Sequence, residues 1–471
     1  MRPIRHAFAV LPLLAAFASG QGLPAGFVYE AVVTTGLHDA CAMAFAPDGR
    51  LFLCERFTGQ VRILRDGVLE PQPWFTISYP QQPGNESGLL GIAIDPQFLT
   101  NGYVYLFYTD PNGLENRIAR VRDVGNIGTQ FTVLTPGGVL PTHPIQIHNG
   151  GRMTFDHQGK LLVSTGDAEN LLNSQDPQSW AGKILRFDVP NLTVPTNNPL
   201  SGNPVYALGL RNTFGITVHP SRGWLFGADN GYLVGDEINH IVSGGNYGWP
   251  IYEGPSSAPG FQSPLLTFTQ QPVLVGLSFY EGSMYPTFQG DLFQCQWLDG
   301  EVRRLTLDAT GSTITSNTLF ADHAHSMDLQ LGPDGNLWVL LGQMFGGADE
   351  VGRYVHTAAP SPGLQISAVS GPSLGGSVTL GVTANVGDVI VPWVGLSAFQ
   401  PAVPTVFGAV SASPDVLLSA LIVGADKRAY YAFELPNSPT FVGVPLYAQA
   451  LRIAPATMTF DMTNLSTHYL R

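Results

Sequence analysis

Short runs of alternating apolar and polar residues recur along this chain, and each follows a turn containing Pro, Asp or Gly. Alternation of this kind is typical of β-strands with one buried face. Six such units, 45 to 67 residues apart when measured between the glycines before their strands, suit blades of four short strands. We therefore predict a six-bladed β-propeller over residues 21–358, because a multi-sheet sandwich would not explain the repetition. The six glycines are Gly49, Gly102, Gly159, Gly223, Gly290 and Gly335.

A change of pattern near residue 360 indicates a second domain. Residues 359–363 are rich in Pro and Ser, as is typical of a linker, and the chain beyond them again alternates like strands. Only 9 of the 108 residues from 364 to 471 are Asp, Glu, Lys or Arg, and nothing there resembles a catalytic pattern. We predict a small β-sandwich over 364–471, used for packing, attachment or carbohydrate contact. The predicted fold class is all-β, a six-bladed β-propeller followed by a small β-sandwich.

Composition supports short strands over helices. The 54 Gly and 37 Pro residues interrupt helices, and the charged fraction of 12% is too low for a coiled coil or long surface helices. The formal net charge of −13 argues against nucleic-acid binding and against docking on anionic lipid. An acidic surface is compatible with an extracellular protein or with bound calcium.

The first twenty residues predict a secretory signal peptide. Arg2 and Arg5 precede an apolar stretch from Ala7 to Phe17, and residues 16–18 resemble a small-residue cleavage site. No run in the chain reaches the length of about 20 apolar residues that a membrane-spanning helix needs. We therefore expect a secreted or periplasmic protein without a membrane span.

Three cysteines are too few, and odd in number, to hold the fold together by disulfides. Cys41 and Cys54 are placed symmetrically about Pro47 and Asp48, so a hairpin turning there would set them opposite each other. Either a disulfide between them or two small buried residues fits this spacing. Cys295 has no such counterpart.

His148 is the first candidate for chemistry. It precedes Asn149-Gly150-Gly151, whose glycines let backbone approach whatever the imidazole faces. A histidine can act as a general base near neutral pH, and Asp167, at the end of the next strand, could orient it or a substrate hydroxyl. The alternative is that His148 only caps a hairpin turn at Asn149-Gly150.

Two further segments combine polar side chains with glycines. Arg211 and Asn212 precede a strand. The guanidinium of Arg211 and the neutral amide of Asn212 could donate to a carboxylate or to a developing oxyanion. The alternative is that Arg211 only ties neighbouring blades together. Asp229, Asp236 and Glu237 lie in a glycine-rich loop. Such carboxylates and free carbonyls are ligands that Ca²⁺ prefers, although aspartates bonding their own turns would give the same pattern.

Taken together, these motifs resemble one family, the soluble pyrroloquinoline quinone (PQQ)-dependent glucose/sorbosone or aldose sugar dehydrogenases. The resemblance spans roughly residues 37–355, and the C-terminal sandwich lies outside it. The segments that carry it are ESGLLGIAIDPQF (86–98), HNGGRMTF (148–155), STGD (164–167), GKILRFD (182–188), GLRNTFG (209–215), GDEINHI (235–241), GGNYGWP (244–250) and GPDGNLWVL (332–340).

The resemblance implies roles at matching positions. His148 would be the catalytic base that takes the proton of a sugar hydroxyl while a hydride passes to the quinone, with Asp167 near the sugar. The residues it places around PQQ are Arg211, Asn212, Glu86 and His325. It places Gly231 and Tyr232 at a catalytic calcium ion, and Glu237 and the Tyr247 carbonyl at a structural one. The implied partners are a small-molecule sugar and an electron acceptor.

Several positions depart from the family pattern. Glu86 replaces a glutamine, whereas Leu298, His325 and Met327 replace cations that would attract the carboxylates of PQQ. Arg303, His323 and His325 could compensate. A non-catalytic calcium-binding propeller that binds a glycan or a protein, as in relatives of hedgehog-interacting protein, is therefore the alternative function. A calcium-dependent lactonase is a third hypothesis, which the segments above do not favour.

Overall fold

The computed structural model describes most of the propeller and the strands of the C-terminal part. The predicted signal peptide and linker lie outside the described residues. No helix among the described residues is long and apolar enough to cross a membrane. The described ranges are 22–356, except 78–85, 111, 113–114, 135–136, 234, 283 and 344–348, and then 365–368, 377–384, 387–396, 398–405, 408–412, 416–423, 428–434, 445–455, 459–462 and 466–469.

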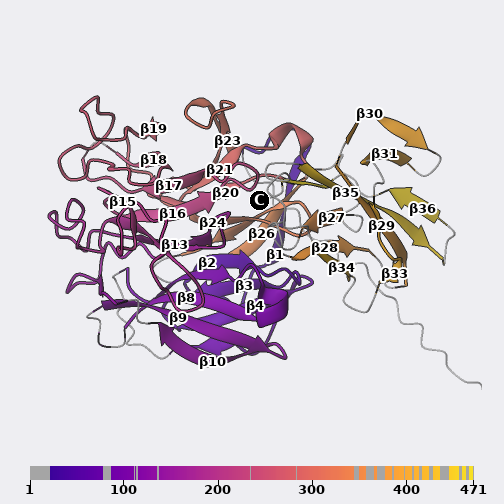
Figure 1. The fold of residues 1–471 in the computed structure, drawn as a ribbon, viewed down its shortest axis with the longest axis horizontal. Helices are drawn as coiled ribbons and strands as arrows, with labels where there is room; N and C mark the ends of the chain where they lie inside the picture. Colours follow the sequence, from indigo (N-terminus) through magenta and orange to yellow (C-terminus); the bar gives the residue numbers. More distant parts are fainter. Residues whose placement is uncertain are drawn as a thin grey trace, which may run out of the picture.

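Six antiparallel sheets confirm the predicted propeller (Figure 1). Contacts between their innermost strands run from each blade to the next and close into a ring. The first three blades, from the innermost strand outward, are β2 (Ala40–Phe45), β3 (Leu51–Glu55), β4 (Gln60–Arg65), β5 (Val68–Leu69) and β6 (Phe75–Thr76); β7 (Leu89–Ile94), β8 (Tyr103–Thr109), β9 (Glu115–Val124), β10 (Ile127–Leu134) and β11 (Leu140–Pro141); and β12 (Met153–Phe155), β13 (Leu161–Thr165), β14 (Lys183–Phe187) and β15 (Val205–Leu208).

The remaining three blades follow the same plan, and each of the two described helices is a single short turn. These blades are β16 (Thr213–Val218), β17 (Leu225–Asp229), β18 (Glu237–Ile241) and β19 (Leu266–Thr267); β20 (Leu274–Phe279), β21 (Leu292–Gln296), β22 (Glu301–Leu307) and β23 (Ile314–Asp322); and β24 (Ser326–Leu331), β25 (Leu337–Leu341), β26 (Glu350–His356) and β1 (Phe27–Val33). The helices are α1 (Phe98–Asn101) and η1 (Pro286–Phe288).

The glycine that recurs in the sequence occupies the same turn in every blade. It lies between the innermost strand and the second strand, with φ between 68° and 86° in all six copies. Residues with a Cβ rarely adopt this left-handed conformation, which explains why glycine stands at this turn. In the second blade a Cβ on Gly102 would also lie 2.7 Å from the carbonyl oxygen of Asp123.

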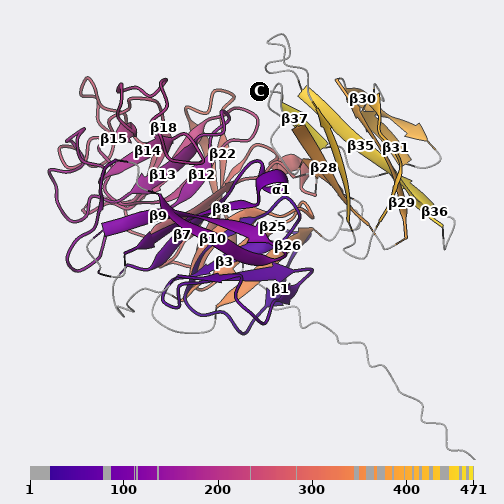
Figure 2. The same ribbon diagram turned by 60° about the horizontal axis from the view of Figure 1, so that its bottom comes forward.

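The two ends of the propeller segment meet in the sixth blade. Strand β1 pairs antiparallel with β26, with Phe27 opposite His356 and Tyr29 opposite Tyr354. Figure 2 shows this indigo strand beside the orange strand β26. Because β1 precedes the first blade in sequence, its pairing closes the ring and covers an edge strand that would otherwise be open to association.

A buried ion pair ties four blades together at the axis. The Arg152 guanidinium donates to the carboxylate of Asp328 (2.9 Å) and to the carbonyls of Cys41 (2.6 Å) and Phe214 (3.1 Å). Next to this ion pair, the innermost strands enclose an open cavity of about 1200 Å³. The cavity lies at the end of the propeller that carries the recurring glycine turns. All three nitrogens of the cation donate to a partner, so its burial is compensated.

All three cysteines are buried and free. The hairpin register pairs Cys54 with Ala42, and a bulge between Ala40 and Ala42 takes Cys41 out of the pairing. The predicted placement of Cys41 opposite Cys54 is therefore wrong. The structure shows small buried residues, the alternative to a disulfide.

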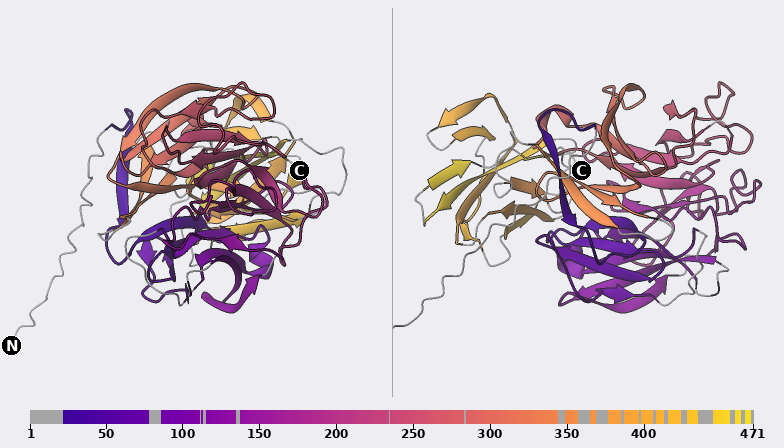
Figure 3. Two further views of the ribbon diagram at one scale, coloured as in Figure 1. Left: turned by 90° about the vertical axis from the view of Figure 1, so that its left-hand side faces the viewer. Right: turned by 180° about the vertical axis from the view of Figure 1, so that it is seen from behind.

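The C-terminal strands form a small sandwich beside the propeller (Figure 1; Figure 3, right). Two sheets share one apolar core, in which Leu380 and Tyr431 from one sheet meet Ile390 and Ala448 from the other. The strands are β27 (Gln365–Ala368), β28 (Ser377–Thr383) and β34 (Arg428–Glu434) in the first sheet; β29 (Val389–Gly395), β32 (Val416–Leu417), β33 (Leu421–Ile422), β35 (Pro445–Ala454), β36 (Thr459–Met462) and β37 (Ser466–Tyr469) in the second; and the separate pair β30 (Ala398–Thr405) and β31 (Gly408–Ala412).

Candidate active site

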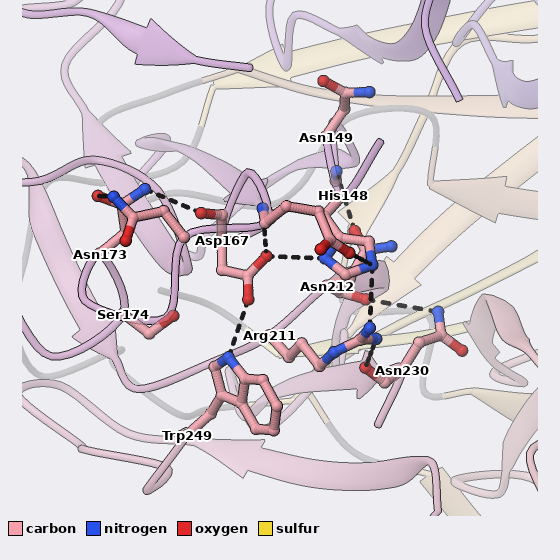
Figure 4. A network of polar contacts seen from close by, with 12 residues as sticks. His148, Asn149, Asp167, Asn173, Ser174, Arg211, Asn212, Asn230 and Trp249 are labelled. Carbon is pink, nitrogen blue, oxygen red and sulfur yellow. Dashed lines mark hydrogen bonds and ion pairs between the residues drawn. The ribbon is translucent and has the colours of Figure 1, made fainter. Parts of the chain in front are cut away.

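Loops from consecutive blades converge at one mouth of the propeller. His148 lies in the loop that enters β12, Asp167 follows β13, and Arg211 and Asn212 enter β16. Glu86 lies ahead of β7. Because the strands of a blade are antiparallel, the innermost strand begins at the same end of the sheet at which the second strand finishes. The loops at this end therefore meet around the axis of the propeller. Figure 4 shows the imidazole of His148 between Asp167 and Arg211.

A buried carboxylate orients the imidazole. Oδ1 of Asp167 lies 2.7 Å from Nδ1 of His148, and Oδ2 accepts the indole N–H of Trp249 at 2.9 Å. Burial raises the pKa of Asp167, but the hydrogen bonds from His148, Trp249 and the backbone N–H of Glu169 outweigh it, so the pKa lies below its usual value. An ionised Asp167 holds the proton on Nδ1 of His148, which leaves the lone pair on Nε2.

Arg211 faces that lone pair. Its Nη2 lies 3.0 Å from Nε2 of His148, while Nη1 donates to the carbonyls of Asn230 (3.0 Å) and Gly231 (2.9 Å). The guanidinium also lies 5.6 Å from the ring centroid of Tyr232 and 5.5 Å from that of Trp249. These contacts hold a permanent positive charge beside the candidate base, where it could stabilise a developing oxyanion.

Glu86 and Asn212 complete this cluster. Oε2 of Glu86 accepts the backbone N–H of His148 at 2.8 Å and the side-chain amide of Asn212 at 3.4 Å. The other end of the amide, Oδ1 of Asn212, accepts the backbone N–H of Gly150 at 3.2 Å. The structure therefore brings together five residues singled out from the sequence, namely Glu86, His148, Asp167, Arg211 and Asn212.

The backbone around His148 is tightly constrained. His148 itself has φ of 52°, a left-handed conformation that is costly for a residue with a side chain. A Cβ at Gly166 would lie only 2.0 Å from the carbonyl oxygen of His148, so the two loops pack backbone against backbone. Gly150 and Gly151 adopt φ of 64° and 102° in the same turn. The glycines of this motif therefore serve the close approach of the loops that carry His148 and Asp167.

Two aspartates stabilise the loops instead of facing the mouth. Asp229 accepts the backbone N–H groups of Arg211 and Asn212, and burial raises its pKa to about 6. Asp236 accepts the backbone N–H groups of Gly231 and Val273. Both carboxylates bind backbone, as the alternative interpretation of this acidic segment expected.

Comparison with known proteins decides the family. The family model described as glucose/sorbosone dehydrogenase matches residues 37–347. The chain belongs to this family. It is 26% identical to the aldose sugar dehydrogenase of Escherichia coli, over 73% of this chain and 97% of that protein.

Solved structures agree with this membership. A putative oxidoreductase (glucose dehydrogenase) from Thermus thermophilus is 33% identical, covers 70% of this chain and 100% of its own, and superposes with a TM-score of 0.62. The PQQ-bound aldose sugar dehydrogenase of Streptomyces coelicolor is 26% identical, covers 71% of this chain and 99% of its own, and has a TM-score of 0.61. The family match lies within the propeller.

Part of the set of residues expected around the family's quinone is arranged to bind such a group. The guanidinium of Arg211, the amide of Asn212 and the imidazole of His148 converge, as binding of a polar carbonyl end requires. Among the described contacts, none joins His325 to them; its ring centroid lies 4.8 Å from that of Trp297, and its Nδ1 faces the Trp297 carbonyl at 3.3 Å.

Arg303, His323 and His325 were expected to compensate for the missing cations. Among the described contacts, none brings a positive charge from these residues to the cluster around His148. Arg303 pairs with Glu301 on an outer strand, and burial lowers the pKa of His323 to about 4, so this imidazole is neutral. Met327 is fully buried in the core, whereas Leu298 is exposed. Leu298 and Met327 therefore carry no cation where the family pattern has one.

The residues expected to bind calcium are engaged in other contacts. The carbonyl of Gly231 accepts from Arg211, and that of Tyr232 accepts from the side-chain amide of Gln271 at 2.6 Å. Glu237 accepts the backbone N–H of Gly254 at 2.6 Å, and burial raises the pKa of this carboxyl to about 7. At Tyr247 the hydroxyl donates to the His240 carbonyl at 2.6 Å, a contact that does not involve the carbonyl expected at the ion. Within the described part of the chain, no group of three or more His, Cys, Asp or Glu side chains is arranged to hold a metal ion.

Sequence reasoning did not single out two members of the cluster. Trp249 lies 82 residues from its partner Asp167, and only its place in the motif 244–250 could have drawn attention to it. Glu169 is closer in sequence, with Oε1 3.1 Å from Nε2 of His148. No pattern in the sequence distinguishes it from an ordinary loop glutamate.

Proposed function

We propose that this protein is a secreted PQQ- and calcium-dependent oxidoreductase that oxidises an aldose-type sugar. The observation that carries the proposal is the polarised imidazole: Asp167 accepts from Nδ1, so Nε2 of His148 is the basic atom, and it lies at the mouth of the propeller. Membership of the glucose/sorbosone dehydrogenase family supports this chemistry. The predicted signal peptide supports export.

In this proposal His148 accepts the hydroxyl proton of the sugar at Nε2. Asp167 keeps the imidazole in the required tautomer, as the acidic member of a catalytic triad does. Arg211 lies beside the same nitrogen, where its positive charge would stabilise a developing oxyanion. When bound, PQQ would supply the hydride acceptor, held at its polar end by Arg211 and Asn212.

Calcium would enter at the loop that contains Gly231 and Tyr232. The Gly231 carbonyl accepts from Arg211 and the Tyr232 carbonyl from Gln271, and each oxygen has a second lone pair that calcium could use. A hard cation prefers such oxygen ligands, and it would lower the electron density of a neighbouring quinone. Glu237 and Tyr247 are proposed for a second, structural ion.

An absorbance titration of the calcium-loaded protein with PQQ tests the cofactor directly. We expect saturable binding, and reduction of an artificial electron acceptor when an aldose is added. His148→Ala should still bind PQQ through Arg211 and Asn212 but lose turnover, because the base is removed. Absence of PQQ binding, together with no activity across a broad panel of aldoses, would contradict the proposal.

A second candidate function is a non-catalytic, calcium-binding propeller that binds a glycan or a protein. The specific observation in its favour is that Leu298, which is exposed, and Met327, which is buried, stand where the family pattern has cations. Glu86 adds a negative charge close to His148. Calcium-dependent binding of a glycan or protein by a chain that does not bind PQQ would establish this function instead.

A further inference from the structure

The basic atom of His148 has two neighbours of opposite charge. Arg211 Nη2 lies 3.0 Å from Nε2, and Oε1 of Glu169 lies 3.1 Å from the same atom. The Glu169 side chain is 39% exposed, whereas those of His148 and Asp167 are 9% and 1% exposed. Glu169 is thus the member of the cluster that links the buried imidazole to solvent.

Only one of the two neighbours can bond to Nε2 in each protonation state. The neutral imidazole presents a lone pair there, which accepts from Arg211 and repels the carboxylate of Glu169. The imidazolium presents an N–H and a positive charge there, which attract Glu169 and repel Arg211. The pair therefore stabilises opposite states of the base.

From this geometry we propose that Glu169 is a positioning residue that stabilises protonated His148 and passes its proton to solvent. The inference rests on the proposed role of His148 as the base. The substrate O–H bond breaks and an N–H bond forms at Nε2; the proton then moves to a Glu169 oxygen and from there to water. The electron pair of the broken C–H bond leaves as hydride to the two-electron acceptor, so charge and protons balance.

The backbone of this segment agrees with a dedicated role for the side chain. Ala168 and Glu169 both adopt left-handed conformations, with φ of 53° and 54°, which are unfavourable for residues with a Cβ. This conformation lets the backbone N–H of Glu169 bond to Oδ1 of Asp167 at 2.9 Å while its carboxylate reaches Nε2 of His148. Strain of this kind persists where neighbouring contacts impose it.

Three further carboxylates and Arg211 lie around His148. Asp167 faces Nδ1 from the end of β13, and Arg211 faces Nε2 from the loop before β16. Glu86, ahead of β7, binds the backbone N–H of His148. Asp229, at the end of β17, lies behind Arg211 and binds its backbone N–H. A comparison of Glu169 with Gln, which has the same shape, therefore isolates one charge.

The direct test is an NMR titration of the His148 imidazole in ¹⁵N-histidine-labelled protein without added cofactor. His148→Gln identifies its signal among the 11 histidines. We expect Glu169→Gln to lower the pKa of His148 by about 0.5–1 unit, because an opposite charge within hydrogen-bond distance is removed. Glu30→Gln is the matched control, since Glu30 is similarly exposed (37%) and pairs with Arg353 on an outer strand. An unchanged pKa in Glu169→Gln would overturn the proposal.

Turnover gives a second readout. In Glu169→Gln the acid limb of the kcat/KM profile should move to lower pH by the same amount as the pKa of His148. At pH values above this limb, kcat should fall about tenfold, because His148 is then a weaker base and has no carboxylate to pass its proton to. Glu169→Gly, which relieves the left-handed conformation, should lose as much kcat without a lower melting temperature. Lower stability with an unchanged pH profile would show a structural role and overturn the proposal. If the unaltered protein shows no turnover, the proposed function fails, and the titration still decides the role of Glu169.

Discussion

Nδ1 of His148 lies 2.7 Å from Oδ1 of Asp167, a carboxylate that is almost completely buried. Asp167→Asn should therefore lower kcat/KM by about 10²–10⁴-fold, because an amide can donate to Nδ1 and shift the proton to Nε2. The fold should be retained, as measured by circular dichroism. Asp308→Asn, on an exposed turn between β22 and β23, is the control and should leave kcat/KM unchanged. Equal activity of the two variants would contradict the orienting role of Asp167.

The second prediction concerns the indole N–H that Trp249 donates to Asp167. Trp249→Phe keeps an aromatic ring beside Arg211 but removes this donor, so the pKa of Asp167 should rise and kcat/KM should fall. We expect a loss of about tenfold. Trp338→Phe is a matched control, because it removes an indole bond to Asp334 in a turn outside this cluster. A similar loss in both variants would point to a general packing effect.

The buried pair of Arg152 and Asp328 makes a stability prediction. Arg152→Met should destabilise the protein by about 3–5 kcal/mol, because it leaves a buried carboxylate without its cation. Urea denaturation of the single variant and of Arg152→Met/Asp328→Asn measures the effect. The double variant should recover part of the loss, since it removes the unpaired charge. Equal stability of the single and double variants would contradict this account.

The fourth prediction concerns Glu281, whose pKa burial raises to about 7. Between pH 4.5 and pH 7 the folded protein keeps a proton there that the unfolded chain loses, so this group makes stability fall as pH rises. The contribution reaches at most about 1.4 kcal/mol per pH unit. Glu281→Gln should flatten this part of the curve of unfolding free energy against pH. An identical curve in the variant would show that Glu281 ionises normally in the folded protein.

Local patterns in the sequence were sufficient to predict the repeating unit. The six glycines adopt positive φ in the turns where hydrophobic alternation predicts hairpins, so each blade is encoded by its own residues. His148 and Asp167 were also recognisable, because they lie 19 residues apart within one blade. The hairpin between Cys41 and Cys54 was predicted in the right place, but the bulge that offsets their register was not.

Contacts between blades could not be predicted in this way. Glu86 and His148 are 62 residues apart, and Trp249 and Asp167 are 82 apart, so nothing in the local sequence indicates that they meet. The pairing of β1 with β26 joins residues more than 300 positions apart. Such contacts form only when the ring closes.

The sequence by itself determined the strands, their glycine turns and the family motifs, because these depend on backbone conformation and burial within each blade. The tertiary structure alone decided which side chains share the mouth of the propeller. It placed Arg211 and Glu169 on the same nitrogen of His148 and assigned Asp229 and Asp236 to the backbone. The physical reason is that the protonation and reactivity of a group depend on charges within a few ångströms, and those distances are set by how the blades pack around the axis.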